Sequence, residues 1–116
     1  LPHGLCMNLF LPYVLEYNQS VNGAKIGELL LPLAGAEIYA QTPAHLRAEK
    51  TIRSISTMRD RLYSLTQLPR TLRETHKVSQ AQFDEIADKA LNDGSMIYNP
   101  KEASLADLKQ ILEKAW

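Results

Sequence analysis

The sequence predicts an all-α protein, a multi-helical bundle that forms one unit over residues 1–116. Three observations support this fold class. Apolar residues recur at steps of three and four along several segments, which is the period of an α-helix. No segment alternates apolar and polar residues as a half-buried strand does. Residues that begin and end helices stand between these segments, and the connections they leave are short.

The first predicted helix covers residues 2–17, PHGLCMNLFLPYVLEY. Apolar residues lie on nearly all of its sides, so it needs neighbours on several faces, and we expect part of it to be exposed in this chain alone. We expect a kink at Pro12, whose ring clashes with the preceding turn. Pro12 and Glu16 also break the run too much for a signal peptide or a membrane span. Residues 18–23, NQSVNG, are typical of a turn.

The middle of the chain predicts a short and a long helix. Residues 24–34 form the short one, interrupted by a proline, and residues 35–41 are either one more helical turn or an irregular connection. Thr42 and Pro43 are typical of the N-cap and first residue of the long helix, which should end before Pro69. Its predicted apolar stripe consists of Ala44, Ala48, Ile52, Ile55, Leu62 and Leu65.

Two further helices are predicted near the C-terminus. Ser79 and Gln82 have the spacing of a capping box at the start of one helix, and Gly94 is expected to end it. Residues 95–103 form a loop, and Ser104 caps the last helix. The predicted buried faces are Phe83, Ile86, Ala87, Ala90 and Leu91 for the first helix and Leu105, Leu108, Ile111, Leu112 and Ala115 for the second.

The charge balance limits the classes of partner. Lys and Arg number 13 and Asp and Glu number 13, so the formal net charge is zero. Residues 47–77 lean basic, but acidic residues are interspersed, which is typical of a solvated helix face. The sequence therefore does not favour nucleic acid as a partner. Its one cysteine, Cys6, cannot form an internal disulfide and is interpreted as a small core residue.

No complete catalytic motif is present. The sequence lacks a glycine-rich phosphate loop, a Cys-x-x-Cys pair and a His-Glu-x-x-His motif. The three histidines, His3, His45 and His76, share no metal-ligand spacing, so this chain alone is not expected to build a whole metal site. His45 with Glu49 is typical of an exposed pair one helical turn apart. For His3, at the start of the apolar helix, two interpretations are open: a ligand or catalytic role, and a capping or packing role.

Four stretches, in order along the whole chain, resemble the iron-containing, group III alcohol dehydrogenases. PHGLCMNLFLPYVLEYN is similar to the family's PHG…N…LLP-h-V…YN, where h is hydrophobic. AKIGELLLPLAG falls where the family has a helix of the IA…LG kind. LTQLPRTLRE resembles G-[IL]-P-x-x-L-R-E. IADKALNDGSMIYNPKEASLADLKQILEKAW resembles the closing segment, in which an Asn-Pro loop precedes a D-[IL]-x-x-[IL]-L helix.

The resemblance implies a fold, an activity and one site residue. In that family, which has a dehydroquinate synthase-like fold, an N-terminal domain binds NAD(P) and a helical C-terminal domain holds most metal ligands, one Asp and three His. The last of these histidines lies in Pro-His-Gly and corresponds to His3. The resemblance therefore implies that His3 is a metal ligand. It also implies that the NAD(P)-binding domain and the first helices of the helical domain precede Leu1 and are absent.

The implied reaction interconverts a primary alcohol and an aldehyde by hydride transfer, with NAD(P) and a divalent metal, iron or zinc. We expect this chain to be inactive alone and to bind neither cofactor by itself. Its implied partners are a small alcohol or aldehyde and the remainder of its own polypeptide, with no membrane. Dimerisation is common in the family, so a homo-oligomer is compatible with it, and a cytoplasmic location is expected.

Two positions depart from the family pattern. A function other than that of a dehydrogenase also stays open. Met7 stands where many members have Asn, with Asn8 next to it, and Tyr13 stands where many have His. The alternative function is that of a standalone helical domain without catalysis, which binds a protein partner through its apolar first helix.

Overall fold

The computed structural model describes residues 1–116, and all of its regular structure is helical. The predicted all-α fold is thus confirmed. No helix is long and apolar enough to span a bilayer. The α-helices are α1 (His3–Glu28), α2 (Leu30–Ala34), α3 (Ala36–Gln41), α4 (Arg47–Thr66), α5 (Phe83–Leu91) and α6 (Leu105–Lys114). The 3₁₀ turns are η1 (Ala44–Leu46), η2 (Arg73–Thr75), η3 (Gln80–Gln82) and η4 (Gly94–Tyr98).

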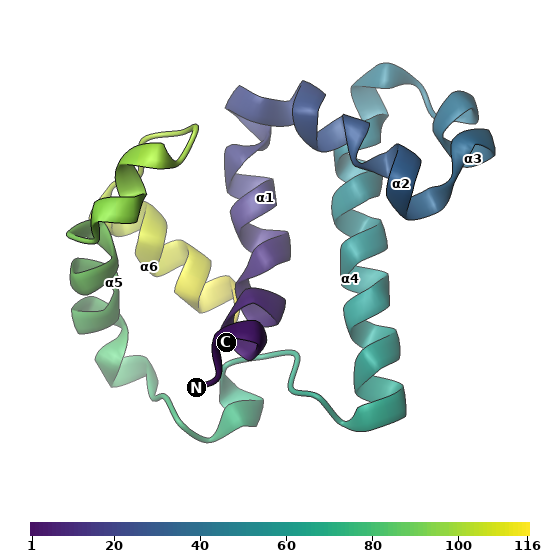
Figure 1. Ribbon diagram of the computed structural model, residues 1–116. Coiled ribbons are helices and arrows are strands. Elements are labelled where there is room, and N and C mark those ends of the chain that lie inside the picture. Colours follow the sequence, from purple (N-terminus) through teal and green to yellow (C-terminus); the bar gives the residue numbers. More distant parts are fainter.

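Helix α1 continues through the segment that was predicted to be a turn. Only Asn22 leaves the helical region inside it, with φ −119° and ψ 19°, and Figure 1 shows the helix bending near its C-terminal end. Pro12, where a kink was predicted, keeps helical backbone angles, and the one break inside α1 lies at Asn22. The amides of Asn18 and Asn99 exchange hydrogen bonds of 3.0 and 2.9 Å. This contact with a distant loop satisfies a side chain that would otherwise favour a local turn.

The apolar segment of residues 24–34, predicted to be one short helix, is divided between α1 and α2. Its first residues belong to the end of α1, and α2 follows after Leu29. Gly35 ends α2 with a φ of +92°, which glycine adopts without strain, and residues 36–41 then form one helical turn, α3. Pro32 is the third residue of α2, where a backbone N–H would have no acceptor within the helix.

The predicted N-cap at Thr42 is wrong. Its hydroxyl donates back to the Ile38 carbonyl at 2.7 Å and closes the end of α3 instead. The chain then passes through η1 before α4 begins, so Pro43 precedes a 3₁₀ turn. The predicted end before Pro69 is confirmed, because α4 stops at Thr66.

Both predicted capping serines do cap helical segments. The Ser79 N–H donates to Gln82 Oε1 at 2.9 Å and closes a capping box at η3, which leads into α5. At α6 the Ser104 N–H donates to Asp107 Oδ2 at 2.9 Å, and the Asp107 N–H donates to Ser104 Oγ at 3.2 Å. Gly94 does not end α5. It begins η4, inside the region predicted as a loop.

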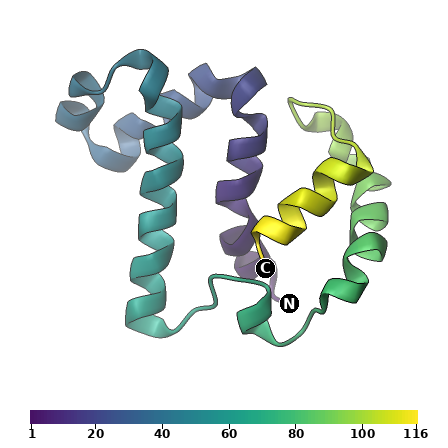
Figure 2. The same ribbon diagram turned by 180° about the vertical axis from the view of Figure 1, so that it is seen from behind.

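Helix α1 lies at the centre of the molecule. Helix α4 packs antiparallel along one side of it, and the α5–α6 pair lies on the other side (Figures 1 and 2). Gly27 permits close contact with the start of α4, since a Cβ there would lie 3.1 Å from the Arg47 Cβ. The hydrophobic core joins α1 to α5, α6 and the connection before α5, through Leu9, Leu72, Phe83, Ala87, Leu112 and Ala115.

Several residues of the predicted apolar faces remain exposed. On α4, Ala48 is buried, but Leu62 and Leu65 expose 43% and 72% of their surface. Leu91 and Leu105 at the ends of α5 and α6 are exposed as well. The radius of gyration is 15.1 Å, whereas about 13.4 Å is typical of a compact 116-residue domain. The chain is thus open and flat, with extents of 44 × 35 × 19 Å.

Gln67 provides a test of the backbone at the end of α4. It is left-handed, with φ 58° and ψ 24°, a conformation that costs a residue with a Cβ about 1 kcal/mol. We expect Gln67→Gly to raise the free energy of unfolding by about 0.5–1 kcal/mol, measured by chemical denaturation. Thr66→Gly, within the helix, should lower it by a similar amount. A destabilised Gln67→Gly protein would mean that the 3.1 Å bond from Gln67 Nε2 to the Tyr63 carbonyl outweighs the strain.

The capping box of α6 predicts a dependence on pH. Backbone and side-chain hydrogen bonds from Ser104 hold the pKa of Asp107 below its ordinary value of 3.8. Because the folded pKa is the lower one, this stabilisation is present above the unfolded pKa and is lost as the pH falls through the folded pKa. We expect Asp107→Asn to lower the Tm at pH 7. We also expect the Tm of this variant to fall less than that of the parent between about pH 5 and pH 2. Asp88→Asn, at an exposed position of α5, should change neither the Tm at pH 7 nor its decline in acid. Equal acid sensitivity of the Asp107→Asn and parent proteins would contradict the assignment.

Candidate functional site

His3 is the first residue of α1, and its side chain is exposed. Pro2 precedes it with an extended backbone, φ −58° and ψ 141°. The Pro2 carbonyl accepts the N–H groups of Leu5 and Cys6, each at 3.1 Å, so the backbone around His3 is held in the first helical turn. The imidazole itself has no hydrogen bond or ion pair within the chain. His3 therefore combines a fixed backbone with an uncommitted side chain.

The end of α1 that carries His3 rests on two other parts of the chain. Asn8 Nδ2 donates to the Pro69 carbonyl at 3.3 Å, which ties α1 to the connection after α4. The Leu72 N–H donates to the Ala115 carbonyl at 2.7 Å, which ties the same connection to the C-terminus. Figures 1 and 2 show both termini and this connection meeting at one end of the molecule. Asn8 thus has a structural partner here, whereas Met7 beside it is half exposed.

The other two histidines do not join His3 in a cluster. His45 lies in η1, at the opposite end of α1, and His76 ends η2; both are exposed. The predicted pair of His45 and Glu49 is not formed, because Glu49 binds Arg53 at 3.2 Å instead. Nowhere do three or more His, Cys, Asp or Glu side chains come together as a metal site would require. His3 fits a divalent metal as one donor, and a tetrahedral site would need three more.

Arg59 lies between α4 and α1 rather than on a solvated face, as the mixed charge of residues 47–77 had suggested. Its Nη2 donates to the Tyr13 hydroxyl at 3.4 Å, and its guanidinium carbon lies 5.3 Å from the centre of the Tyr13 ring. The Nε and Nη1 atoms are buried without a hydrogen-bond partner. The sequence carried no signal for this contact, because the charge pattern of α4 does not show which cation faces α1.

A polar cluster fastens α1 to the start of α6. The Tyr17 hydroxyl donates to the Glu102 carbonyl at 2.5 Å and lies 3.1 Å from Asp107 Oδ2. Lys101 Nζ lies 4.2 Å from the centre of the Tyr17 ring and donates to the Tyr17 carbonyl at 3.3 Å. Burial, and then the neighbouring Asp107 carboxylate, raise the pKa of Tyr17. The phenol therefore keeps its proton and acts as a structural donor.

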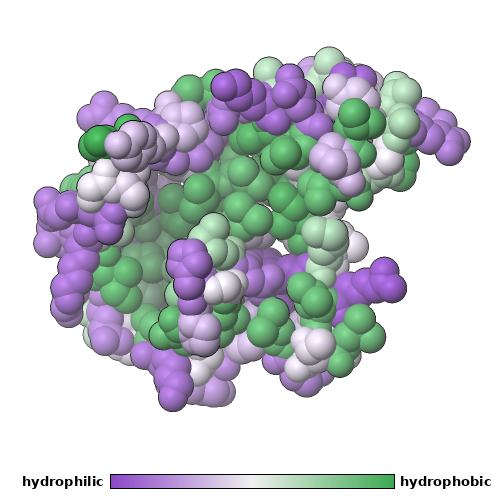
Figure 3. All heavy atoms as spheres, viewed as in Figure 1, coloured by the Kyte–Doolittle hydropathy of each residue, from purple (hydrophilic) through white to green (hydrophobic).

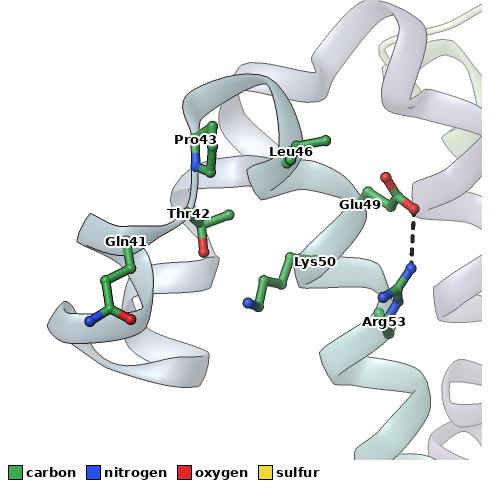
Figure 4. A pocket seen from close by; sticks show the side chains of 7 residues that line it. All are labelled: Gln41, Thr42, Pro43, Leu46, Glu49, Lys50 and Arg53. Carbon is green, nitrogen blue, oxygen red and sulfur yellow. Dashed lines mark hydrogen bonds and ion pairs between the residues drawn. The ribbon is translucent and has the colours of Figure 1, made fainter.

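The surface hollows do not bring further catalytic groups to His3. One hollow of about 380 Å³ at the end of α4 is lined by Tyr63, Arg73, Glu74 and His76, but not by His3. Figure 4 shows a groove of about 340 Å³ beside the start of α4, in which Glu49 pairs with Arg53 and Lys50 reaches toward α3. No histidine or cysteine lines it. A second pocket, of about 200 Å³, is entirely apolar and is lined by Phe10, Val14, Ile86, Ala87, Ala90, Leu108, Ile111 and Leu112. A pocket without polar groups cannot orient or activate a reactant.

Comparison with known proteins gives consistent matches over the whole chain. The protein-family model described as "Fe-containing alcohol dehydrogenase family, C-terminal" matches residues 1–116. A 1,3-propanediol dehydrogenase from Klebsiella pneumoniae is 30% identical over 116 residues, which are 100% of this chain and 28% of the relative. An alcohol dehydrogenase from Thermococcus barophilus and a lactaldehyde reductase from Escherichia coli (strain K12) are each 26% identical, over 99% of this chain and 28% of the relative.

A solved structure has the same fold. The crystal structure of a 1,3-propanediol oxidoreductase superimposes on the whole chain with a TM-score of 0.84 at 27% sequence identity, and the match covers 28% of that protein. The present chain thus spans about 28% of the length of the curated relatives it matches.

The buried guanidinium of Arg59 gives a stability prediction. A buried donor without a partner costs about 1–3 kcal/mol, so Arg59→Met, which keeps a long apolar side chain, should raise the free energy of unfolding by a similar amount. Arg61→Met, at an exposed position of the same helix, should change it by less than about 0.5 kcal/mol. Both values come from chemical denaturation. A less stable Arg59→Met protein would show that the contact with Tyr13 outweighs the unpaired donors.

Proposed function

The chain belongs to the Fe-containing alcohol dehydrogenase family, and from this membership we propose that it works as the C-terminal helical part of a longer, NAD(P)-linked and metal-dependent alcohol dehydrogenase. The observation that carries the proposal is His3, an exposed imidazole without a partner at the start of the central helix. Support also comes from the fold, which over the whole of this chain matches 28% of a 1,3-propanediol oxidoreductase. The proposed reaction interconverts a small primary alcohol and its aldehyde.

His3 is proposed to be one ligand of a divalent metal, iron or zinc. A neutral imidazole binds such ions through a ring nitrogen, and no group of this chain competes for that nitrogen. A bound divalent cation supplies the positive charge that stabilises the deprotonated form of an alcohol near neutral pH. The other ligands and the nucleotide-binding residues are proposed to lie elsewhere in the full-length protein.

The contribution of this chain to the reaction is the position of His3. The Pro2 carbonyl fixes the first turn of α1, and Asn8, in the second turn, ties the helix to the connection after α4. The C-terminal residues support the same connection through the Leu72–Ala115 bond. Groups that position a ligand in this way influence metal affinity because they limit the motion of the ligand.

The proposal predicts that the chain alone is inactive. Residues 1–116, incubated with NAD or NADP, a primary alcohol and ferrous or zinc ions, should form no reduced nicotinamide. The reason is that one imidazole cannot hold the metal without further ligands. The measurement is the absorbance of the reduced nicotinamide, with the full-length protein as positive control. Turnover by residues 1–116 alone would contradict the proposal.

A substitution in the full-length protein tests the role of His3. We expect His3→Ala to weaken metal binding by more than about 100-fold, because it removes a direct ligand. Metal content after dialysis, measured by mass spectrometry of the elements, gives this value independently of activity. His45→Ala, at an exposed histidine at the other end of α1, should retain the metal of the parent. Full metal retention by a folded His3→Ala protein would rule out His3 as a ligand.

A further inference from the structure

We propose that the hollow at the C-terminal end of α4, here called the α4 hollow, binds an oxyanion, either inorganic phosphate or the phosphate group of a nucleotide. Figure 1 shows the chain leaving the lower end of α4 there and passing toward the end of the molecule at which both termini lie. The inference does not rest on the proposed function, because none of the lining residues is a proposed metal ligand. The α4 hollow has a volume of about 380 Å³ and is lined by Tyr63, Gln67, Pro69, Arg73, Glu74 and His76.

The one carboxylate that lines the α4 hollow is already engaged within the chain. Glu74 Oε2 accepts the backbone N–H groups of Arg70 and Thr71 at 2.6 and 3.3 Å, and Glu74 Oε1 lies 3.7 Å from Arg70 Nη2. Arg70 also binds Asp60 at 3.4 Å, and its guanidinium carbon lies 3.9 Å from the centre of the Tyr63 ring. Because Arg70 counters its charge, Glu74 repels an incoming anion less strongly than a free carboxylate would.

The hydrogen-bond donors of the α4 hollow, in contrast, have no partner within the chain. Arg73 and His76 are exposed, and neither side chain makes a hydrogen bond or an ion pair. The Tyr63 hydroxyl is unbonded as well. A guanidinium, an imidazole and a hydroxyl can all donate to phosphate oxygens, and the fork of an arginine matches two of them. Residues 60–77 contain four Lys and Arg and two Asp and Glu, so their formal charge of +2 also favours an anion.

The α4 hollow also contains both residues with a side chain whose backbone is left-handed. Gln67 and His76 have φ values of 58° and 54°, and both line the hollow. This conformation costs free energy for a residue with a Cβ, and glycine avoids the cost. The family pattern G-[IL]-P-x-x-L-R-E indeed has glycine where Gln67 stands. Polar side chains thus occupy positions at which the backbone favours glycine, and strained positions of this kind cluster at ligand sites.

A short turn fixes the two principal donors relative to each other. The His76 N–H donates to the Arg73 carbonyl at 3.2 Å, and the Thr75 hydroxyl donates to the Leu72 carbonyl at 2.6 Å. Leu72 belongs to the hydrophobic core, so the turn is anchored to the body of the molecule. Donors that are held in place before binding lose less conformational entropy when the ligand arrives.

The chemistry of the α4 hollow differs from that of the other hollows. Figure 3 shows hydrophobic side chains gathered over α1 and in the hollow beside the α5–α6 pair, where the pocket is entirely apolar. In the groove of Figure 4, Arg53 is paired with Glu49 at 3.2 Å. Only the α4 hollow combines an unpaired arginine with an unpaired histidine, and this pair is what selects an oxyanion.

Binding of inorganic phosphate to the full-length protein tests the proposal. Equilibrium dialysis with radiolabelled phosphate, at an ionic strength held constant with chloride, gives the Kd. We expect Arg73→Gln to raise this Kd by at least about 10-fold, because a charge-assisted hydrogen bond is lost. Arg61→Gln, at an exposed arginine of α4, should change the Kd by less than about twofold. An equal Kd for the parent and Arg73→Gln proteins, or no saturable binding in the millimolar range, would overturn the proposal.

His76→Gly gives a second result that a loss of structure cannot produce. The variant removes the imidazole and relieves the left-handed backbone, so the Tm without phosphate should rise. The Kd for phosphate should rise at least about threefold in the same protein, because a donor is lost. His45→Ala, at an exposed histidine outside the hollow, should leave the Kd unchanged. A His76→Gly protein that is more stable and binds phosphate as the parent does would overturn the assignment.

The Kd of the nucleotide distinguishes the two sources of phosphate. If Arg73→Gln weakens NAD or NADP as well as phosphate, the α4 hollow takes the phosphate group of the nucleotide. If it weakens phosphate alone, the ligand is inorganic phosphate. Phosphate binding that persists in the His3→Ala protein without metal would support the α4 hollow independently of the proposed function. Phosphate binding that disappears with the metal would place the anion at the metal and overturn the proposal.

Discussion

Helix α1 is apolar around most of its circumference, and this constraint governs the rest of the structure. Helix α4 covers one side of it and the α5–α6 pair covers another. The sides that face these helices contain Leu9, which is fully buried, and Gly27, which allows close contact with α4. Met7 and Leu11 lie on the remaining side and stay exposed. The flat shape follows, because three groups of helices stand side by side with nothing over that face.

The same helix links the fold to the candidate site. His3 begins α1, so any contact that fixes the first turns of α1 also fixes the imidazole. Asn8 makes such a contact with the Pro69 carbonyl, and Leu72 joins this connection to the C-terminus and to the core. The residues that hold His3 therefore come from segments more than 60 positions apart in the sequence. Its position is a product of the whole fold.

The sequence was a good guide to local features and a poor one to long-range contacts. The capping boxes at Ser79 and Ser104 were predictable, because each depends on two residues three positions apart. The turn expected at residues 18–23 failed because Asn18 finds Asn99, a partner 81 positions away. Thr42 is not an N-cap because its hydroxyl donates to the Ile38 carbonyl in the helix before it.

The candidate site, too, was predictable from the sequence only in part. His3 was singled out by its Pro-His-Gly context and by the family resemblance, and its exposed position at the start of α1 suits the proposed role. The resemblance could not reveal the contact of Arg59 with Tyr13, because a buried cation between two helices depends on how they pack.

The uncovered apolar side chains of α1 and the incomplete set of metal ligands are separate observations. Both indicate that this chain works together with other residues. On α1, Met7 and Leu11 are left uncovered, and the single free imidazole of His3 lacks the further donors that a metal requires. Met7 lies four residues after His3 on α1, so both features lie in the first turns of the same helix. In the proposed function, the missing donors would therefore approach the end of α1 at which apolar side chains are also uncovered.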